Sequence, residues 1–68
     1  MATTEKAKMF DVLAVNLKTM AVRFMAENKD AGNADAISDM AAIRRGCDIE
    51  FYPVVPHGKY KEGDRYGD

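Results

Sequence analysis

The chain has 68 residues, of which 47% are hydrophobic and 31% are charged. That composition is typical of one small globular domain and differs from that of a disordered chain. Ten Lys and Arg residues against eleven Asp and Glu residues give a net charge of −1. We therefore expect no non-specific binding to nucleic acid and no binding to anionic membranes. A single cysteine excludes an internal disulfide and a zinc site made of several thiolates, and we expect no metal and no cofactor.

The first eight residues are mostly polar and are predicted to be flexible. They lack the apolar segment of a signal peptide, and no stretch of the chain approaches the roughly 18 apolar residues that span a bilayer. The lone Cys47 fits a reducing compartment. These features predict a cytoplasmic protein.

Two strands are predicted first, and together they form a hairpin. Residues 9–16 read Met-Phe-Asp-Val-Leu-Ala-Val-Asn, a β-branched and aromatic run with apolar side chains on both faces. Such a run is typical of a central strand that is buried on both sides. Residues 21–28 place Val22, Phe24 and Ala26 on one face, and residues 17–20 form the connection.

A helix is predicted over residues 31–45. Asp30 is a suitable N-cap, Arg44 and Arg45 suit the negative C-terminal end of the helix dipole, and Gly46 suits the left-handed position that follows. Helical spacing places six residues on the apolar half of this helix. They are Ala34, Ala36, Ile37, Met40, Ala41 and Ile43.

Residues 48–55 form a third predicted strand, which Pro53 restricts to an edge or bulged position. Residues 57–68 are polar and rich in Gly, and they are predicted to be a C-terminal tail with little order. The fold class is therefore α+β. One β-β-α-β domain spans residues 9–56, with a three-stranded antiparallel sheet of order 2-1-3 and one helix on one face.

A domain of about 50 residues has a marginal core, and one helix covers only one face of a sheet. The other face is predicted to expose apolar side chains such as Leu13, Val15 and Met25. Because exposed patches of this kind usually form interfaces, we predict that the chain assembles into a homo-oligomer, a dimer or larger.

Two groups of residues are candidates for ligand contact. Arg44 and Arg45 either cap the helix or offer planar donors to a carboxylate or phosphate at a subunit boundary. The second group places aromatic residues beside basic ones, and such a pair can hold a nucleic acid base and its phosphate. The simpler interpretation is that Phe51 belongs to the core and that the tail is solvated. The members of the second group are Phe51, Tyr52, His57, Lys59, Tyr60 and Lys61.

No catalytic constellation is recognisable in the sequence. Cys47 and His57 are predicted to lie at opposite ends of the third strand, so a Cys/His nucleophile pair is not expected. There is no Gly-rich phosphate loop and no metalloprotease or hydrolase motif. We therefore expect no enzyme activity.

Several segments of the sequence together resemble a family of short proteins of tailed bacteriophages and prophages. They are residues 9–16, Lys18-Thr19, residues 21–28, residues 33–37, Met40-Ala41, residues 44–46 and residues 50–52. The resemblance covers residues 9–63 and implies no catalytic residues. The family often has Lys-Thr-Gly in its hairpin turn, whereas Met20 stands in the Gly position here, where a side chain disfavours a positive φ.

The resemblance implies a host-defence antagonist in the cytoplasm of a bacterium. Our first hypothesis is capture of a phosphorylated, nucleotide-like signal at a subunit interface. The residues assigned to phosphate are Arg23, Arg44, Arg45 and Lys59, and those assigned to stacking on a base are Tyr52 and Tyr60. The alternatives are direct inhibition of a host defence nuclease or effector through the free edge strand and apolar sheet face, or a structural or accessory phage role.

Overall fold

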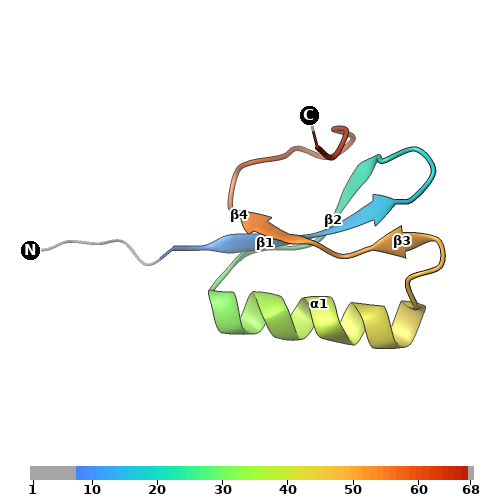
Figure 1. The fold of residues 1–68 in the computed structure, drawn as a ribbon. Coiled ribbons are helices and arrows are strands. Elements are labelled where there is room, and N and C mark those ends of the chain that lie inside the picture. The colour runs from blue at the N-terminus through green and yellow to red at the C-terminus, as the bar shows by residue number, and fades with distance from the viewer. Residues whose placement is uncertain (1–7, 68) are drawn as a thin grey trace, which may run out of the picture.

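A computed structural model describes residues 8–67 and shows one sheet covered by one helix (Figure 1). The elements are β1 (Phe10–Asn16), β2 (Val22–Lys29), α1 (Ala31–Arg45), β3 (Glu50–Phe51) and β4 (Val54–Pro56). β1 lies in the middle and pairs antiparallel with β2 on one side and with β3 and β4 on the other. The predicted α+β class and strand order 2-1-3 are confirmed. The predicted flexible N-terminus lies outside the described residues except for Lys8.

The predicted third strand is divided into β3 and β4 at Tyr52 and Pro53. Proline has no amide hydrogen to donate, so the regular pairing with β1 stops there. One bond bridges the gap, because the Leu13 amide donates to the Pro53 carbonyl at 3.0 Å. The two short strands therefore act as one edge strand with an interruption.

The hairpin turn between β1 and β2 is closed by an asparagine. Asn16 Oδ1 accepts hydrogen bonds from the amides of Lys18 at 2.8 Å and Thr19 at 2.9 Å. The Met20 amide donates to the Asn16 carbonyl at 2.7 Å, and Met20 itself adopts a φ of 63°. A non-glycine residue thus occupies the left-handed position where glycine would be unstrained.

The caps of α1 agree with the sequence prediction. Asp30 accepts a hydrogen bond from the Asn33 amide at 2.9 Å, and Gly46, with a φ of 76°, donates its amide to the Ala42 carbonyl at 2.9 Å. The helix therefore begins and ends where its capping residues predict. No helix within residues 8–67 has the length and apolar character needed to cross a membrane.

The predicted apolar face of α1 is wrong in part. Ala34 and Ala41 are buried as predicted, but Met40 and Ile43 are 49% and 78% exposed. Ser38 faces the sheet instead, where its hydroxyl donates to the Tyr52 carbonyl at 2.6 Å. This bond and the small alanine side chains bring a different stripe of the helix against β1, and Ala36, Met40 and Ile43 face outward. The half-buried members of the stripe are Ile37, Ser38 and Ala42.

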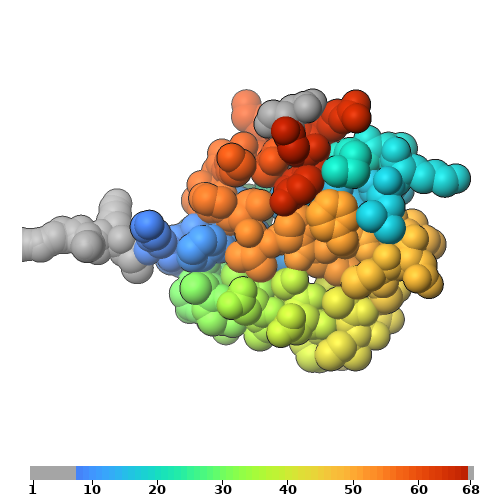
Figure 2. Space-filling view, in the orientation of Figure 1, coloured from blue at the N-terminus to red at the C-terminus, as the bar shows by residue number. Residues whose placement is uncertain are grey.

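Residues 57–67, here called the C-terminal segment, are not the disordered tail that composition predicts. They fold back over the sheet on the side opposite α1 (Figures 1 and 2). Tyr60 is only 8% exposed, and its ring stacks on Tyr66 with 5.4 Å between centroids. Tyr66 also meets Phe51 edge to face at 5.4 Å. Two tyrosines thus cover this face of the sheet, although the rest of the segment is mostly polar.

The C-terminal segment also pairs with the outer edge of β2. Val22 donates its amide to the Asp64 carbonyl at 2.8 Å and accepts a bond from the Gly63 amide at 2.9 Å. The Tyr66 amide donates to the Met20 carbonyl at 2.8 Å, and an antiparallel bridge joins Ala21 to Arg65. These bonds satisfy part of an edge that would otherwise be open to another chain.

The apolar patch predicted for oligomer formation is therefore absent from the described residues. Leu13 and Val15 are fully buried beneath the C-terminal segment, and Met25 packs in the cluster on the helix side. The prediction was wrong here because it ended the domain at residue 56. It therefore did not include the cover that residues 57–67 supply to this face of the sheet. Assembly into a homo-oligomer stays a prediction, but this patch no longer supports it.

Candidate functional site

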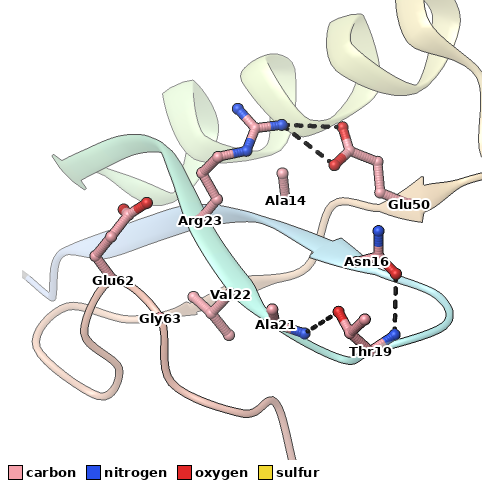
Figure 3. A pocket seen from close by; sticks show the side chains of 9 residues that line it. All are labelled: Ala14, Asn16, Thr19, Ala21, Val22, Arg23, Glu50, Glu62 and Gly63. Carbon is pink, nitrogen blue, oxygen red and sulfur yellow. Dashed lines mark hydrogen bonds and ion pairs between the residues drawn. The ribbon is translucent and has the colours of Figure 1, made fainter.

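A pocket of about 320 Å³ opens at the hairpin end of the sheet, and we call it the Arg23 pocket (Figure 3). Its walls come from three parts of the chain, namely the β1–β2 hairpin, the start of β3 and the C-terminal segment. The lining residues are Ala14, Asn16, Thr19, Ala21, Val22, Arg23, Glu50, Glu62 and Gly63.

Arg23 and Glu50 face each other across the small side chain of Ala14 (Figure 3). Arg23 lies opposite Ala14 in the pairing of β1 with β2, and Glu50 lies opposite Asn16 in the pairing of β1 with β3. Nη2 of Arg23 lies 3.3 Å from Oε1 and 3.2 Å from Oε2 of Glu50. Since Nη2 makes both contacts, Nη1 and Nε of the same guanidinium remain available as donors.

Glu50 is the centre of a wider network. Its side chain is 18% exposed, and its Oε1 lies 3.5 Å from Nη1 of Arg45 and 3.2 Å from the hydroxyl of Tyr52. Two guanidinium groups thus share one carboxylate, and the group of three carries a net positive charge. Arg45 does not line the Arg23 pocket, whose charged lining residues are Arg23, Glu50 and Glu62.

Tyr52 belongs to the core rather than to a binding surface. It is buried with Val12, Ala34 and Ala41, and its hydroxyl lies 3.3 Å from the Gly46 carbonyl. Burial raises the pKa of Tyr52, and the negative charge of Glu50 raises it further. The ring therefore has no free face on which a base could stack.

Other polar groups of the Arg23 pocket complement the guanidinium. Asn16 uses its Oδ1 in the hairpin turn, and its side-chain amide nitrogen points to the Glu50 side of the pocket (Figure 3). The Thr19 hydroxyl accepts from the Ala21 amide at 3.2 Å and keeps its own hydrogen to donate. Glu62 accepts from the Phe24 amide at 3.3 Å. The pocket therefore offers several donors and two carboxylates.

Three of the six residues predicted to bind a ligand come together in the structure, namely Arg23, Arg45 and Tyr52, and they surround Glu50. Arg44 is exposed on α1. Lys59 and Tyr60 lie in the C-terminal segment, on the other face of the sheet, where Nζ of Lys59 is 5.8 Å from the Tyr60 ring centroid. Tyr60 is buried in the second core cluster, so the prediction that it stacks on a base is not supported.

A second polar centre, which sequence reasoning missed, lies at the opposite end of β1. Asp11 is only 1% exposed, and its carboxylate accepts hydrogen bonds from the amides of Asn28 at 2.8 Å and Gly58 at 3.1 Å. Nδ1 of His57 lies 2.7 Å from its Oδ1. Burial alone would raise the pKa of Asp11, but these hydrogen bonds and the charge of His57 outweigh that effect and lower it.

The signal for this centre was present in the sequence. Asp11 interrupts an apolar run, and a charged residue inside a strand that is buried on both sides needs partners. The partners could not be identified because Asn28 and Gly58 contribute backbone amides, which no side-chain pattern reveals. The polar composition of residues 57–68 predicts a solvated tail, which would place His57 away from β1.

Cys47 is an exposed free thiol in the loop between α1 and β3. Within residues 8–67, no group of three or more His, Cys, Asp and Glu side chains is placed to hold a metal ion.

Comparisons of the chain with protein-family models, with curated proteins and with solved structures gave no match. The resemblance to proteins of tailed bacteriophages therefore stays a prediction. What can be inferred about function rests on the two polar centres themselves.

Proposed function

We propose that the chain is a small binding protein that holds a phosphorylated small molecule in the Arg23 pocket. The observation that carries this proposal is the geometry of Arg23, whose guanidinium contacts Glu50 through one nitrogen, is half exposed and lines an open pocket. A planar guanidinium that is already oriented loses little freedom when it binds a phosphate oxygen.

The neighbouring groups support the same ligand class. Asn16 and Thr19 add uncharged donors beside Arg23, and donors of this kind commonly contact phosphate and hydroxyl oxygens. Glu50 suits the hydroxyl groups of a sugar, which donate to carboxylates. A phosphorylated sugar or nucleotide would therefore find a partner for each kind of polar group.

The biological role that we propose is sequestration of a nucleotide-like signal, which would antagonise a bacterial defence system. The phage context of this role comes from the sequence resemblance alone. The support from the pocket is limited to binding, because its arginine and uncharged donors are groups that hold an anion. The sequence also predicts that a second copy of the chain contributes to the ligand site at a subunit interface.

The test is a thermal-shift titration with ADP-ribose and with a cyclic dinucleotide. A ligand present at 100 times its dissociation constant should stabilise the protein by about 2.7 kcal/mol. Arg23→Gln should weaken binding by about ten-fold or more, the size expected when a charged hydrogen-bond donor is lost. Arg44→Gln is the matched control, because Arg44 is an exposed arginine outside the pocket. Absence of any shift, or equal losses in both variants, would contradict the proposal.

A further variant tests the sign of the charge effect. Glu62→Gln keeps an oxygen to accept the Phe24 amide and removes one negative charge from the pocket wall. Binding of a phosphorylated ligand should become about two- to five-fold tighter, as expected for a partly screened charge. Weaker binding would show that the ligand donates to Glu62 rather than being repelled by it.

Direct inhibition of a host protein is the second candidate, and one observation favours it. Large apolar side chains are exposed on α1, in the β1–β2 connection and in the loop before β3, namely Leu17, Met40, Ile43 and Ile49. The Leu17 amide donates to the Ile49 carbonyl at 2.9 Å, so these two residues lie side by side. Ile43→Lys should abolish capture of a protein partner, and Arg23→Gln should leave that capture unchanged.

A further inference from the structure

The buried Asp11 fixes both the tautomer and the orientation of the His57 ring. Its carboxylate is ionised and can only accept, so Nδ1 of His57 must carry the hydrogen in their 2.7 Å contact. Nε2 on the other side of the ring has no hydrogen-bond partner within residues 8–67. The side chain of His57 is 46% exposed, so solvent and solutes reach the ring.

A hollow of about 470 Å³ lies beside this ring, and we call it the His57 hollow. Its lining residues are Lys8, Met9, Phe10, Pro56 and His57. The two contributing segments are held together by backbone contacts, because the His57 amide donates to the Met9 carbonyl at 3.0 Å and Phe10 pairs with Pro56. The hollow thus has an apolar floor, the imidazole of His57 at its edge and Lys8 among its lining residues.

We propose that the His57 hollow is a second ligand site, which takes an organic anion with an apolar body. The anion contacts the ammonium of Lys8 and, in the protonated ring, the Nε2–H of His57. The apolar body lies against the floor. An imidazole that is held at Nδ1 by a buried carboxylate is oriented before the ligand arrives, which reduces the entropy lost on binding.

This site is independent of the Arg23 pocket. The His57 hollow lies at the Phe10 end of β1, and the Arg23 pocket lies at the Asn16 end. The two pockets share no lining residue, so either proposal can fail without the other.

The experiment is an NMR titration of the isotopically labelled protein with phenyl phosphate. The resonances of Met9, Phe10 and the His57 ring should shift with a saturable profile. Inorganic phosphate and benzyl alcohol should each bind at least about ten-fold more weakly, because each lacks one half of the ligand. Shifts confined to Arg23 and Asn16 would place the anion in the other pocket and overturn this proposal.

Two substitutions separate ligand binding from folding. His57→Asn keeps an amide hydrogen at the place of Nδ1 for Asp11 but removes Nε2, so it should preserve the melting temperature and weaken phenyl phosphate by about ten-fold. Lys8→Met should weaken binding without touching Asp11, whereas Lys18→Met in the hairpin turn, the matched loss of one exposed lysine, should not. Unchanged affinity in both His57→Asn and Lys8→Met would overturn the proposal, and if His57→Asn does not fold, Lys8→Met decides alone.

Discussion

The two covers of the sheet are made in different ways. On one face, α1 packs alanines closely against β1 and ends in regular caps. On the other face, the C-terminal segment has no helix or named strand and is held by two tyrosines, a few backbone bonds to β2 and the buried Asp11. The comparison shows that an irregular polar segment can complete a core when a few large side chains and one satisfied carboxylate anchor it.

Both candidate sites depend on the irregular cover. Glu62 and Gly63 line the Arg23 pocket, and His57 lines the hollow at the other end. The helix contributes to neither lining. The C-terminal segment therefore links the completion of the core with the formation of both sites.

The largest effect should follow from removing the aromatic anchor of the C-terminal segment. Tyr60→Ala should lower the free energy of unfolding by about 3 kcal/mol, because it leaves a cavity over Leu13 and Val15. Tyr60→Phe is the control. It loses only the bond in which the Gly67 amide donates to the Tyr60 hydroxyl at 3.1 Å, so it should cost about 1 kcal/mol. Urea denaturation measures both, and equal small losses would show that the segment is not part of the core.

Replacing the buried carboxylate should have the next largest effect. Asp11→Asn should cost about 2 kcal/mol, since three donors lose a charged acceptor. Asp35→Asn, at an exposed carboxylate of α1, is the control and should change stability little.

The same pair of variants gives a pH test. The pKa of Asp11 is lower in the folded than in the unfolded state, so its contribution is complete above its ordinary value of 3.8. That contribution is lost as the pH falls from there through the folded pKa. Asp11→Asn should flatten the acid limb of the stability curve, and an unchanged limb would contradict the role of Asp11.

The helix side offers a smaller and cleaner contrast between two glycines. Gly46→Ala should destabilise the protein by about 1 kcal/mol, because Gly46 has a φ of 76° while an added Cβ would meet nothing within 4 Å. Gly32→Ala should stabilise it by about 0.5–1 kcal/mol, because Gly32 lies inside the helix and its Cβ would make only an ordinary 3.6 Å contact. Thermal melts that moved in the same direction for both variants would contradict the assigned helix end.

The smallest stability effect is expected at the second carboxylate. Glu50→Gln should cost less than about 1 kcal/mol, because Arg23 and Arg45 are about half exposed and their ion pairs are weakened by solvent. Comparing this loss of unfolding free energy with that of Asp11→Asn shows how much each carboxylate stabilises its end of the sheet. A loss at Glu50 equal to that at Asp11 would show that its network is structural.

The sequence predicted the regular half of the molecule well. Capping residues located α1, a β-branched and aromatic run located β1, and Pro53 marked the interrupted edge. Alternation located β2, but Ala26 packs in the cluster on the helix side and not with Val22 and Phe24, because the pairing of β1 with β2 is irregular. The orientation of the helix was less predictable, because alanines give little contrast between faces and the hydrogen bond of Ser38 decided it.

The irregular half escaped prediction for a physical reason. The C-terminal segment has no periodicity, and its contacts are backbone bonds to distant residues such as Val22. Arg23, Arg45 and Tyr52 were three of six residues predicted to bind a ligand at a subunit boundary, and their meeting around Glu50 within one chain was not predicted. The partnership of Asp11 with His57 was missed because it joins residues 46 positions apart.

Amide hydrogen exchange tests the central claim most directly, namely that the C-terminal segment is a fixed layer of the fold. The amides of Gly63 and Tyr66 donate to carbonyls of the β1–β2 hairpin, and that of Gly58 donates to Asp11. All three should exchange far more slowly than amides of an unstructured peptide, at rates close to that of the Leu13 amide in β1. Exchange of these three amides at unstructured rates, with Leu13 still protected, would contradict the account.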